Sequence, residues 1–284
     1  SNKMEITNKN SELLKNIEMY EHDGWTIVKD LVPQKKLKEL RTYLIDVMIA
    51  AFGDVCSVEK TEHIDLDTAF NQLDLNSDEA LDIIKIAKNS IPFLQIITHE
   101  QIVRVVKQLQ KSKTIHCVHD IAQFRIDPCD GSRRTFDWHQ DYPYNQTSND
   151  AITAWIPITK VESDMGLLRL IPSSHKMNVS IEFDKSKKKG VGDTNKILKF
   201  HFEQNMVANE IDTPEMFPGD VLFFHSKLLH KSGNNMSEGR SRWVCNPRYS
   251  NSVDKELVDR KWLSVNDRNV NELIEKFVTE RLKV

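Results

Sequence analysis

Two histidines and one aspartate stand at positions from which they could share a metal ion. His139 and Asp141 are two residues apart, and His230 follows far downstream. On a strand, a spacing of two points both side chains to the same face, and a later strand can supply the third ligand. Two imidazoles and a carboxylate can occupy one face of an octahedral Fe(II), leaving three positions for a cosubstrate and O₂. The pattern favours a non-heme iron oxygenase.

The neighbouring sequence strengthens this interpretation. A strand-like run at 121–126 precedes the first two residues, and a Pro-Gly-Asp turn at 218–220 opens into the apolar run 221–224 before His230. Polar and cationic residues follow His230, namely Ser232, Asn235, Arg240 and Arg242. A guanidinium just past the last ligand suits a dicarboxylate cosubstrate, because it holds carboxylate through paired, charge-assisted hydrogen bonds.

The elements that must position these residues are short strands between two helical regions. Helical spacing dominates 10–110, a β-rich core covers 114–250, and helix returns at 254–284. Short strands separated by turns suggest a sandwich or barrel. The expected strands are 114–127, 135–141, 151–158, 167–171, 198–203, 207–212, 221–224 and 241–248. We therefore expect a single domain over 1–284, mainly β with flanking helices.

Composition excludes several classes of protein. The chain has 284 residues and a net charge of −3, which gives no general attraction to nucleic acid or to an anionic membrane. No apolar stretch approaches the ~20 residues of a membrane helix, and no apolar N-terminal segment suggests a secretion signal. The four cysteines form no C-x-x-C pair, which argues against a zinc knuckle or a disulfide framework. We expect a cytoplasmic protein, monomeric or homodimeric.

Several other residues could contact a substrate. Tyr142 and Tyr144 directly follow Asp141, so they cannot lie far from the metal. Asp127 alternates with Arg125 and Gln123 along one strand, so all three could face the same cavity. Further cations stand at Arg133, Arg134 and in the run 184–196, which is either a solvated loop or a lid for an acidic substrate. These cations favour an anionic small molecule without identifying it.

The remaining histidines are expected to be structural. His225 ends the same apolar run that precedes His230, so it would lie beside the site without being a ligand. His175 follows a Pro-Ser-Ser turn and is expected to stabilise a loop. His116 and His119 are three residues apart, a spacing that suits neither a strand face nor a ligand pair.

Taken together, the chain resembles the phytanoyl-CoA dioxygenase family of Fe(II)/2-oxoglutarate oxygenases along nearly its whole length. Residues 20–30 and 37–41 are similar to the family's opening segment, and 138–141 to its first iron motif. The segment 166–176 is similar to the stretch ending in Pro-Gly-Ser-His, with Ser173 where glycine is usual. The distal motif is matched by 218–220 followed by His230, Ser232 and Asn235.

The resemblance implies a double-stranded β-helix, a cupin-like jelly roll. It implies that His139, Asp141 and His230 bind iron, and that Arg242 and Ser232 bind the distal carboxylate of 2-oxoglutarate. Gln140 and Trp155 match positions that line the cosubstrate pocket, and Gln123 lies on the strand that often contributes to the cosubstrate or substrate site. The sequence between Asn235 and the arginines is shifted by one residue against the family pattern. Arg240 therefore stays open as an alternative to Arg242.

The implied reaction uses Fe(II), 2-oxoglutarate and O₂ to hydroxylate an unactivated C–H bond, releasing succinate and CO₂. Halogenating relatives carry glycine or alanine in place of the carboxylate ligand, so Asp141 favours hydroxylation over halogenation. Desaturation, epimerisation and ring formation use the same triad and remain open. Two further alternatives are a jelly-roll metalloenzyme that does not use 2-oxoglutarate and a non-catalytic jelly-roll binding module.

Overall fold

The structure, a computed structural model, describes residues 2–53, 65–73, 78–129, 136–145, 147–183, 198–262 and 278. Arg133, Arg134 and the lysine-rich run 184–196 lie outside these ranges, as does most of the helix expected at 254–284. Of that helix, the structure describes α8 (Lys255–Asp259) and residue 278.

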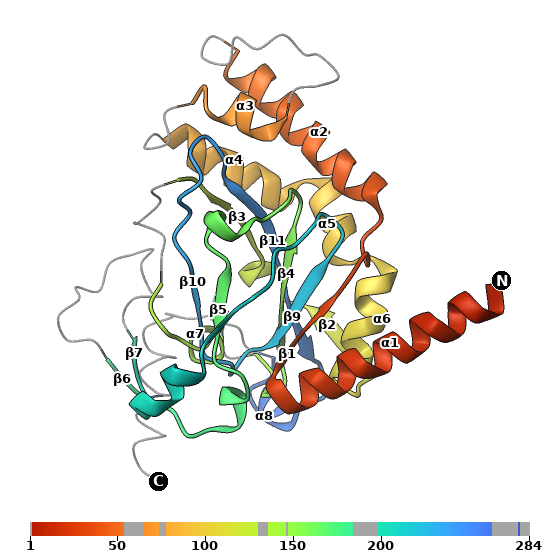
Figure 1. Cartoon of the computed structure of the whole chain (residues 1–284), viewed down its shortest axis with the longest axis vertical. Helices are drawn as coiled ribbons and strands as arrows, with labels where there is room; N and C mark the ends of the chain where they lie inside the picture. Colours follow the sequence, from red (N-terminus) through yellow and green to blue (C-terminus); the bar gives the residue numbers. More distant parts are fainter. Residues whose placement is uncertain are drawn as a thin grey trace.

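Two antiparallel sheets form the centre of the molecule (Figure 1). The larger contains β1 (Trp25–Val28), β9 (Val221–His225), β4 (Ile152–Pro157), β11 (Arg242–Asn246) and β3 (Gln123–Asp127), paired in that order. Its other two strands are β12 (Arg248–Asn251), which pairs with β4, and β2 (Ile115–Cys117), which pairs with β12. The smaller sheet contains β10 (His230–Ser232), β5 (Leu168–Leu170) and β8 (Ile211–Asp212). A separate hairpin joins β6 (Ser180–Phe183) to β7 (Leu198–His201).

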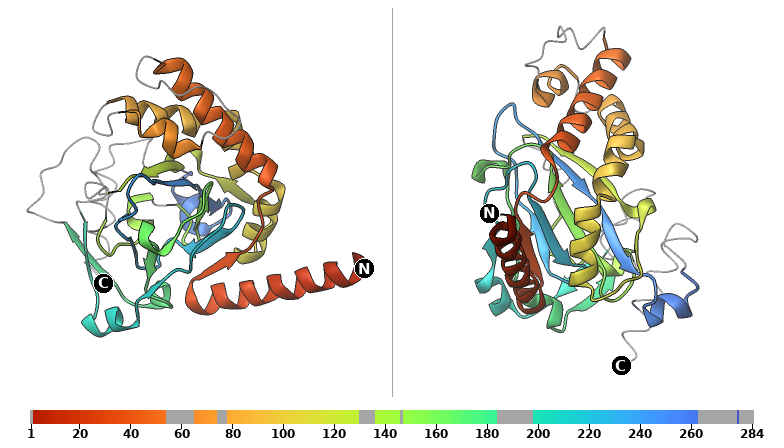
Figure 2. Two further views of the ribbon diagram at one scale, coloured as in Figure 1. Left: turned by 45° about the horizontal axis from the view of Figure 1, so that its top comes forward. Right: turned by 90° about the vertical axis from the view of Figure 1, so that its right-hand side faces the viewer.

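Helices cover the outer face of the larger sheet (Figure 2). They are α2 (Gln34–Ala51), α3 (Leu66–Phe70), α4 (Asp78–Asn89), α5 (Ile91–Ile97) and α6 (Glu100–Leu109). Helix α1 (Asn2–Asp23) packs beside β1, and α7 (Tyr142–Asn145) is a single turn. Short 3₁₀ turns occur at 119–121, 163–165, 174–176 and 204–209. No described helix has the length and apolarity to span a bilayer.

The larger sheet has two different faces because side chains alternate along each strand. On β11, Trp243 and Cys245 join the apolar core shared with the helices, whereas Val244 packs into a second apolar cluster between the sheets. On β3, Phe124 and Ile126 take the helix side. The alternate residues of both strands, including the charged ones, therefore face the interior of the jelly roll.

The expected helical start and β-rich centre are confirmed, but several expected strands differ in detail. The strand expected at 135–141 is wrong where the structure describes it: His139 makes only an isolated bridge, and α7 begins at Tyr142. The run 114–127 is broken by a 3₁₀ turn into β2 and β3. In 207–212 the first half belongs to another 3₁₀ turn, and only 211–212 pair as a strand.

Candidate active site

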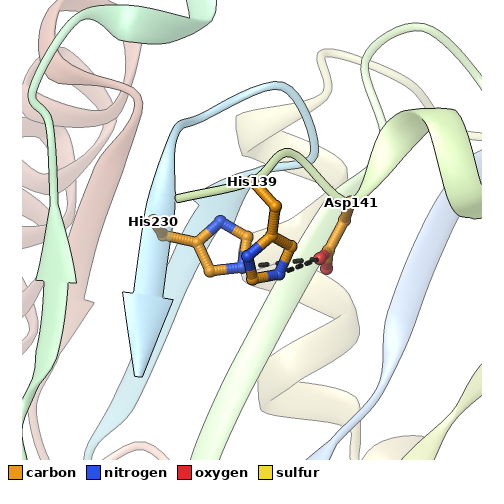
Figure 3. A group of neighbouring side chains, drawn as sticks. All are labelled: His139, Asp141 and His230. Atoms are coloured by element: carbon orange, nitrogen blue, oxygen red, sulfur yellow. Dashed lines mark ion pairs between the residues drawn. The ribbon is translucent and has the colours of Figure 1, made fainter. Parts of the chain in front are cut away.

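The isolated bridge brings the two histidines together. His139 and His230 each donate a backbone hydrogen bond to the other's carbonyl oxygen at 3.1 Å, and their ring centroids are 4.3 Å apart. The Asp141 carboxylate oxygen Oδ1 lies 3.6 Å from Nε2 of His139 and 3.4 Å from Nε2 of His230 (Figure 3). All three donor atoms lie within 4.8 Å of one another.

Backbone carbonyls fix the orientation of both imidazoles. Nδ1 of His139 lies 2.8 Å from the Asp137 carbonyl oxygen, and Nδ1 of His230 lies 2.9 Å from that of Leu228. A carbonyl only accepts, so Nδ1 carries the hydrogen and Nε2 keeps its lone pair toward the cluster. Burial, reinforced by His230, lowers the pKa of His139 to about 3. The cluster therefore offers neutral imidazole donors near neutral pH, which suits a divalent transition metal.

Asp141 is held by two residues from neighbouring strands. Its Oδ2 accepts a hydrogen bond from the Thr153 hydroxyl at 2.8 Å, and from Nε and Nη2 of Arg248 at 3.2 and 3.1 Å. Burial raises the pKa of Asp141, but Arg248 and the two histidines outweigh this and hold the pKa well below its usual range. The carboxylate is therefore ionised and turned with Oδ1 toward the imidazoles.

Arg242 lies inside the jelly roll and Arg240 does not. The Arg242 side chain is 4% exposed, and its Nη1 donates to the carbonyl oxygens of Gly166 and Gly233. Its Nε has no hydrogen-bond partner among the residues that the structure describes. Arg240 instead ion-pairs with Glu162 and is 39% exposed. A buried guanidinium with an unused donor suits a carboxylate ligand, so the geometry favours Arg242.

The other residues expected to bind or line the site of the cosubstrate have different neighbours in the structure. Ser232, two residues after His230 on β10, lines a cavity of about 590 Å³ together with Gly166 and Gly233. Trp155 packs in the interior apolar cluster. The Gln140 side chain donates to the Lys227 carbonyl oxygen at 2.6 Å, which ties the iron motif to the turn before β10. Gln123 pairs with Asn246 at the other end of β3 from Asp127.

The two tyrosines expected at the substrate are both buried. The Tyr142 hydroxyl donates to Glu256 at 3.1 Å. Tyr144 lies in an apolar cluster with Ile181 and Leu198 of the β6–β7 hairpin, and its ring centroid is 6.1 Å from that of Phe200. The hairpin and α7, which begins directly after Asp141, therefore form one apolar wall.

The histidines expected to be structural lie outside the cluster. The rings of His175 and His225 are 5.2 Å apart, and Nδ1 of His225 accepts from the Lys227 backbone N–H. His116 lies on β2, hydrogen-bonded to Ser252 at 2.7 Å. Among the residues that the structure describes, His139, Asp141 and His230 alone form a group that could hold a metal ion.

Sequence reasoning missed Arg248 and Thr153. Arg248 follows Pro247 on a separate strand, with no motif of its own. Thr153 is two residues before Trp155, so strand periodicity could have placed it on the same interior face. The contact of either residue with Asp141 can be expected only once β4 and β12 are known to pair.

The close approach of Gly166 and Gly233 gives a prediction about stability. Gly166 has φ +75, and a Cβ there would lie 2.5 Å from the Gly233 backbone. Gly239 has a similar φ of +73, but its Cβ would meet nothing nearer than 3.9 Å. Left-handed backbone costs ~1–2 kcal/mol for a residue with a Cβ, and overpacking adds ~1–3 kcal/mol.

We therefore expect Gly166→Ala to lower the free energy of unfolding by about 2–5 kcal/mol, and Gly239→Ala by only about 1–2 kcal/mol. Urea denaturation of both variants measures the difference. Equal losses would show that the backbone conformation alone, and not the contact with Gly233, determines the need for glycine at 166.

Comparison with known proteins identifies the family. The phytanoyl-CoA dioxygenase family model matches residues 20–244. The chain belongs to the phytanoyl-CoA dioxygenase family. It is an Fe(II)- and 2-oxoglutarate-dependent dioxygenase, which uses O₂ as its further substrate.

Two phytanoyl-CoA dioxygenases are similar to this chain over most of its length. A probable phytanoyl-CoA dioxygenase of Caenorhabditis elegans is 26% identical over 237 residues, covering 78% of this chain and 70% of the relative. The peroxisomal phytanoyl-CoA dioxygenase of Bos taurus is 23% identical over 283 residues, covering 90% and 78%. The 1-deoxypentalenic acid 11-beta-hydroxylase of Streptomyces exfoliatus is 36% identical over 109 residues, covering 35% and 34%.

Solved structures of this fold confirm the jelly roll. The epimerase SnoN, in complex with Fe³⁺, alpha ketoglutarate and nogalamycin RO, superposes with a TM-score of 0.57 at 15% identity, covering 86% of this chain and 85% of SnoN. The non-heme monooxygenase ThoJ, as its nickel complex, gives 0.54 at 17% identity, covering 84% and 77%. At these identities the likeness concerns the fold alone.

Proposed function

We propose that this dioxygenase hydroxylates an unactivated C–H bond of a small molecule that carries an acidic group, and releases succinate and CO₂ from 2-oxoglutarate. The observation that carries the proposal is the convergence of His139, Asp141 and His230, with the buried Arg242 on a strand of the same interior. A metal cluster and a buried guanidinium inside one jelly roll match what the cosubstrate requires.

His139, Asp141 and His230 would hold Fe(II), which together with 2-oxoglutarate and O₂ supplies the oxidising chemistry. Arg248 and Thr153 orient the Asp141 carboxylate, because both donate to the oxygen that faces away from the imidazoles. Such outer contacts set the direction and basicity of a metal ligand.

Arg242 and Ser232 would bind the distal carboxylate of 2-oxoglutarate. The Nη1 contacts to Gly166 and Gly233 fix the guanidinium plane, while the buried Nε has no hydrogen-bond partner among the described residues. Trp155, Gln140 and Gln123 would line the cosubstrate pocket. Fixing these groups in advance reduces the ordering needed when the cosubstrate binds.

The charges inside the jelly roll favour an anionic substrate. Arg125 and Arg242 share Asp127, and Arg248 pairs with Asp141, so these five side chains together carry one excess positive charge. Fe(II) adds two positive charges and the 2-oxoglutarate dianion removes two. Because uncompensated buried charge is costly, a singly charged acid would complete the balance. Two relatives are named for phytanoyl-CoA and for 1-deoxypentalenic acid.

The apolar wall of the hairpin and α7 would receive the body of the substrate. Tyr144 and Phe200 supply aromatic surface there, and Tyr142 lies at the start of α7. Arg133 and Arg134 are proposed to contact the acidic group at the mouth of the site, although both lie outside the described residues. A hydrophobic acid is therefore the substrate class that fits best.

An anaerobic titration with Fe(II) and 2-oxoglutarate tests the cofactor chemistry. We expect a weak charge-transfer band at about 500 nm only when both components are present, because the 2-oxo acid must chelate the metal. Tight metal binding without the band would favour a jelly-roll metalloenzyme that does not use 2-oxoglutarate.

A second screen tests the substrate class by succinate release. Apolar carboxylic acids are compared with their matched primary amides. We expect the acids to accelerate succinate release and to gain one oxygen atom in the product mass. A product that has lost two hydrogens would indicate desaturation or ring formation, and a stereochemically inverted product of unchanged mass would indicate epimerisation.

A further inference from the structure

Three charged side chains line up across β3 and β11 inside the jelly roll. The register pairs Asp127 with Arg242 and Arg125 with Val244. The Asp127 carboxylate lies between the two guanidinium groups, and the side chains are 17%, 8% and 4% exposed for Arg125, Asp127 and Arg242. A carboxylate of the protein itself therefore stands next to the arginine that the proposed function assigns to the cosubstrate.

The two arginines share this carboxylate unequally. Arg125 binds both oxygens of Asp127, with Nη2 at 3.0 Å from Oδ1 and Nε at 3.2 Å from Oδ2. Arg242 makes one longer contact, with Nη2 at 3.4 Å from Oδ2. Two-point, charge-assisted pairing of guanidinium with carboxylate is the stronger arrangement. Of these two arginines, Arg125 therefore makes the stronger pair with Asp127.

Arg242 is held in place by other groups. Its Nη1 donates to the carbonyl oxygens of Gly166 and Gly233, and in the described part of the chain its Nε has no hydrogen-bond partner. The side chain thus keeps its position through the backbone and retains donor capacity. A dicarboxylate that arrives at Arg242 would have to compete with Asp127 only for the longer contact.

We infer that Arg125 is a positioning residue, which holds the Asp127 carboxylate away from Arg242 and so keeps that guanidinium available to 2-oxoglutarate. This inference rests on the proposed function, in which Arg242 binds the distal carboxylate. Without Arg125, Asp127 would turn to Arg242, form the two-point pair itself and repel the incoming carboxylate. The affinity for 2-oxoglutarate then depends on a residue that does not touch it.

A double-mutant cycle tests the inference by 2-oxoglutarate binding, not by turnover. The Fe(II)-loaded protein is titrated anaerobically with 2-oxoglutarate, and the Kd is read from the charge-transfer band. We expect Arg125→Gln to raise this Kd by roughly 10-fold or more, because 2-oxoglutarate must then displace a two-point, charge-assisted pair between Asp127 and Arg242. Asp127→Asn removes the competing charge, so it should bind 2-oxoglutarate at least as tightly as the wild type.

The double variant Arg125→Gln/Asp127→Asn is the decisive one. It should return the Kd to within about threefold of the wild type, since neither partner then carries a charge to be neutralised. Arg125→Lys should lie between the wild type and Arg125→Gln, because a lysine keeps the charge but loses the two-point geometry. Fe(II) affinity and thermal unfolding are measured alongside, because Arg125 also lies near Asp141 and His139.

Three results would overturn the inference. The first is an unchanged 2-oxoglutarate Kd in Arg125→Gln. The second is a double variant that binds 2-oxoglutarate as weakly as Arg125→Gln does. The third is weaker 2-oxoglutarate binding in Asp127→Asn alone than in the wild type. If Arg125→Gln does not fold, the 2-oxoglutarate Kd of Asp127→Asn still tests the inference. The proposed function is tested separately by Arg242→Gln. An unchanged Kd for 2-oxoglutarate in this variant would show that Arg242 is not the cosubstrate anchor. A weakened Arg242→Gln beside an unchanged Arg125→Gln would reject only the role of Arg125.

Discussion

Replacing His139 or Asp141 with alanine is expected to abolish iron binding and turnover. Each substitution removes one of three donors that lie within 4.8 Å of one another, and the two that remain cannot occupy one face of the metal. The fold should survive in His139→Ala, because the bridge to His230 uses backbone atoms only. Iron content after anaerobic loading, with succinate release as the activity, measures both effects.

The two variants should differ in stability. Asp141→Ala leaves Arg248 buried without the carboxylate that it binds at 3.1 Å, and an unpaired buried charge costs ~3–5 kcal/mol. His139→Ala leaves no buried charge without a partner in this way. Its thermal unfolding should therefore lie closer to that of the wild type, and Asp141→Asn is the milder substitution at the carboxylate.

A matched control for the histidine variant lies on the β6–β7 hairpin. His201 is 46% exposed and pairs with Glu182 at the surface, so His201→Ala should bind iron normally and turn over normally. Full activity in His139→Ala or in Asp141→Ala would reject the metal assignment. Loss of iron in His201→Ala would show that the assay reports general damage.

The metal cluster could be predicted from the sequence because most of it is local. His139 and Asp141 stand in one short motif, and His230 follows a recognisable turn and strand. The residues that orient the cluster could not be found in this way. Arg248 lies 107 positions from Asp141, and only the pairing of β12 with β4 brings them together.

The local structure of the motif was predicted less well than its chemistry. Period-two spacing suggested a strand through 141, yet His139 is held by a single bridge to β10 and α7 starts one residue after Asp141. The two side chains converge because long-range contacts fix each of them separately. These contacts are the bridge to His230 and the pairing of Asp141 with Arg248.

Periodicity could not separate Arg240 from Arg242, because residues two apart share a face of a strand. The structure separates them by where the strand begins. Strand β11 starts at Arg242, so Arg240 belongs to the preceding turn after Gly239, where it pairs with Glu162. A strand start is determined by pairing with β3, which one sequence alone does not reveal.

Arg242→Ala is expected to raise the Kd for 2-oxoglutarate by roughly 100-fold while leaving Fe(II) affinity intact, since a charge-assisted carboxylate contact is worth ~2–3 kcal/mol. The metal ligands do not contact Arg242 in the described structure, so the loss should be confined to the cosubstrate. Titration of the charge-transfer band gives this Kd, and succinate release gives the matching rise in the 2-oxoglutarate KM.

Arg240→Ala is the matched control, because it removes the same side chain two residues away. Its guanidinium pairs with Glu162 at the surface, where exposed ion pairs contribute at most ~1 kcal/mol. We expect its 2-oxoglutarate Kd to stay within about twofold of the wild type, since its loss removes no contact in the interior. If Arg240→Ala carries the large effect and Arg242→Ala does not, the anchor is the surface arginine. The pairing of Arg242 with Asp127 would then be purely structural, because no ligand would compete for that guanidinium.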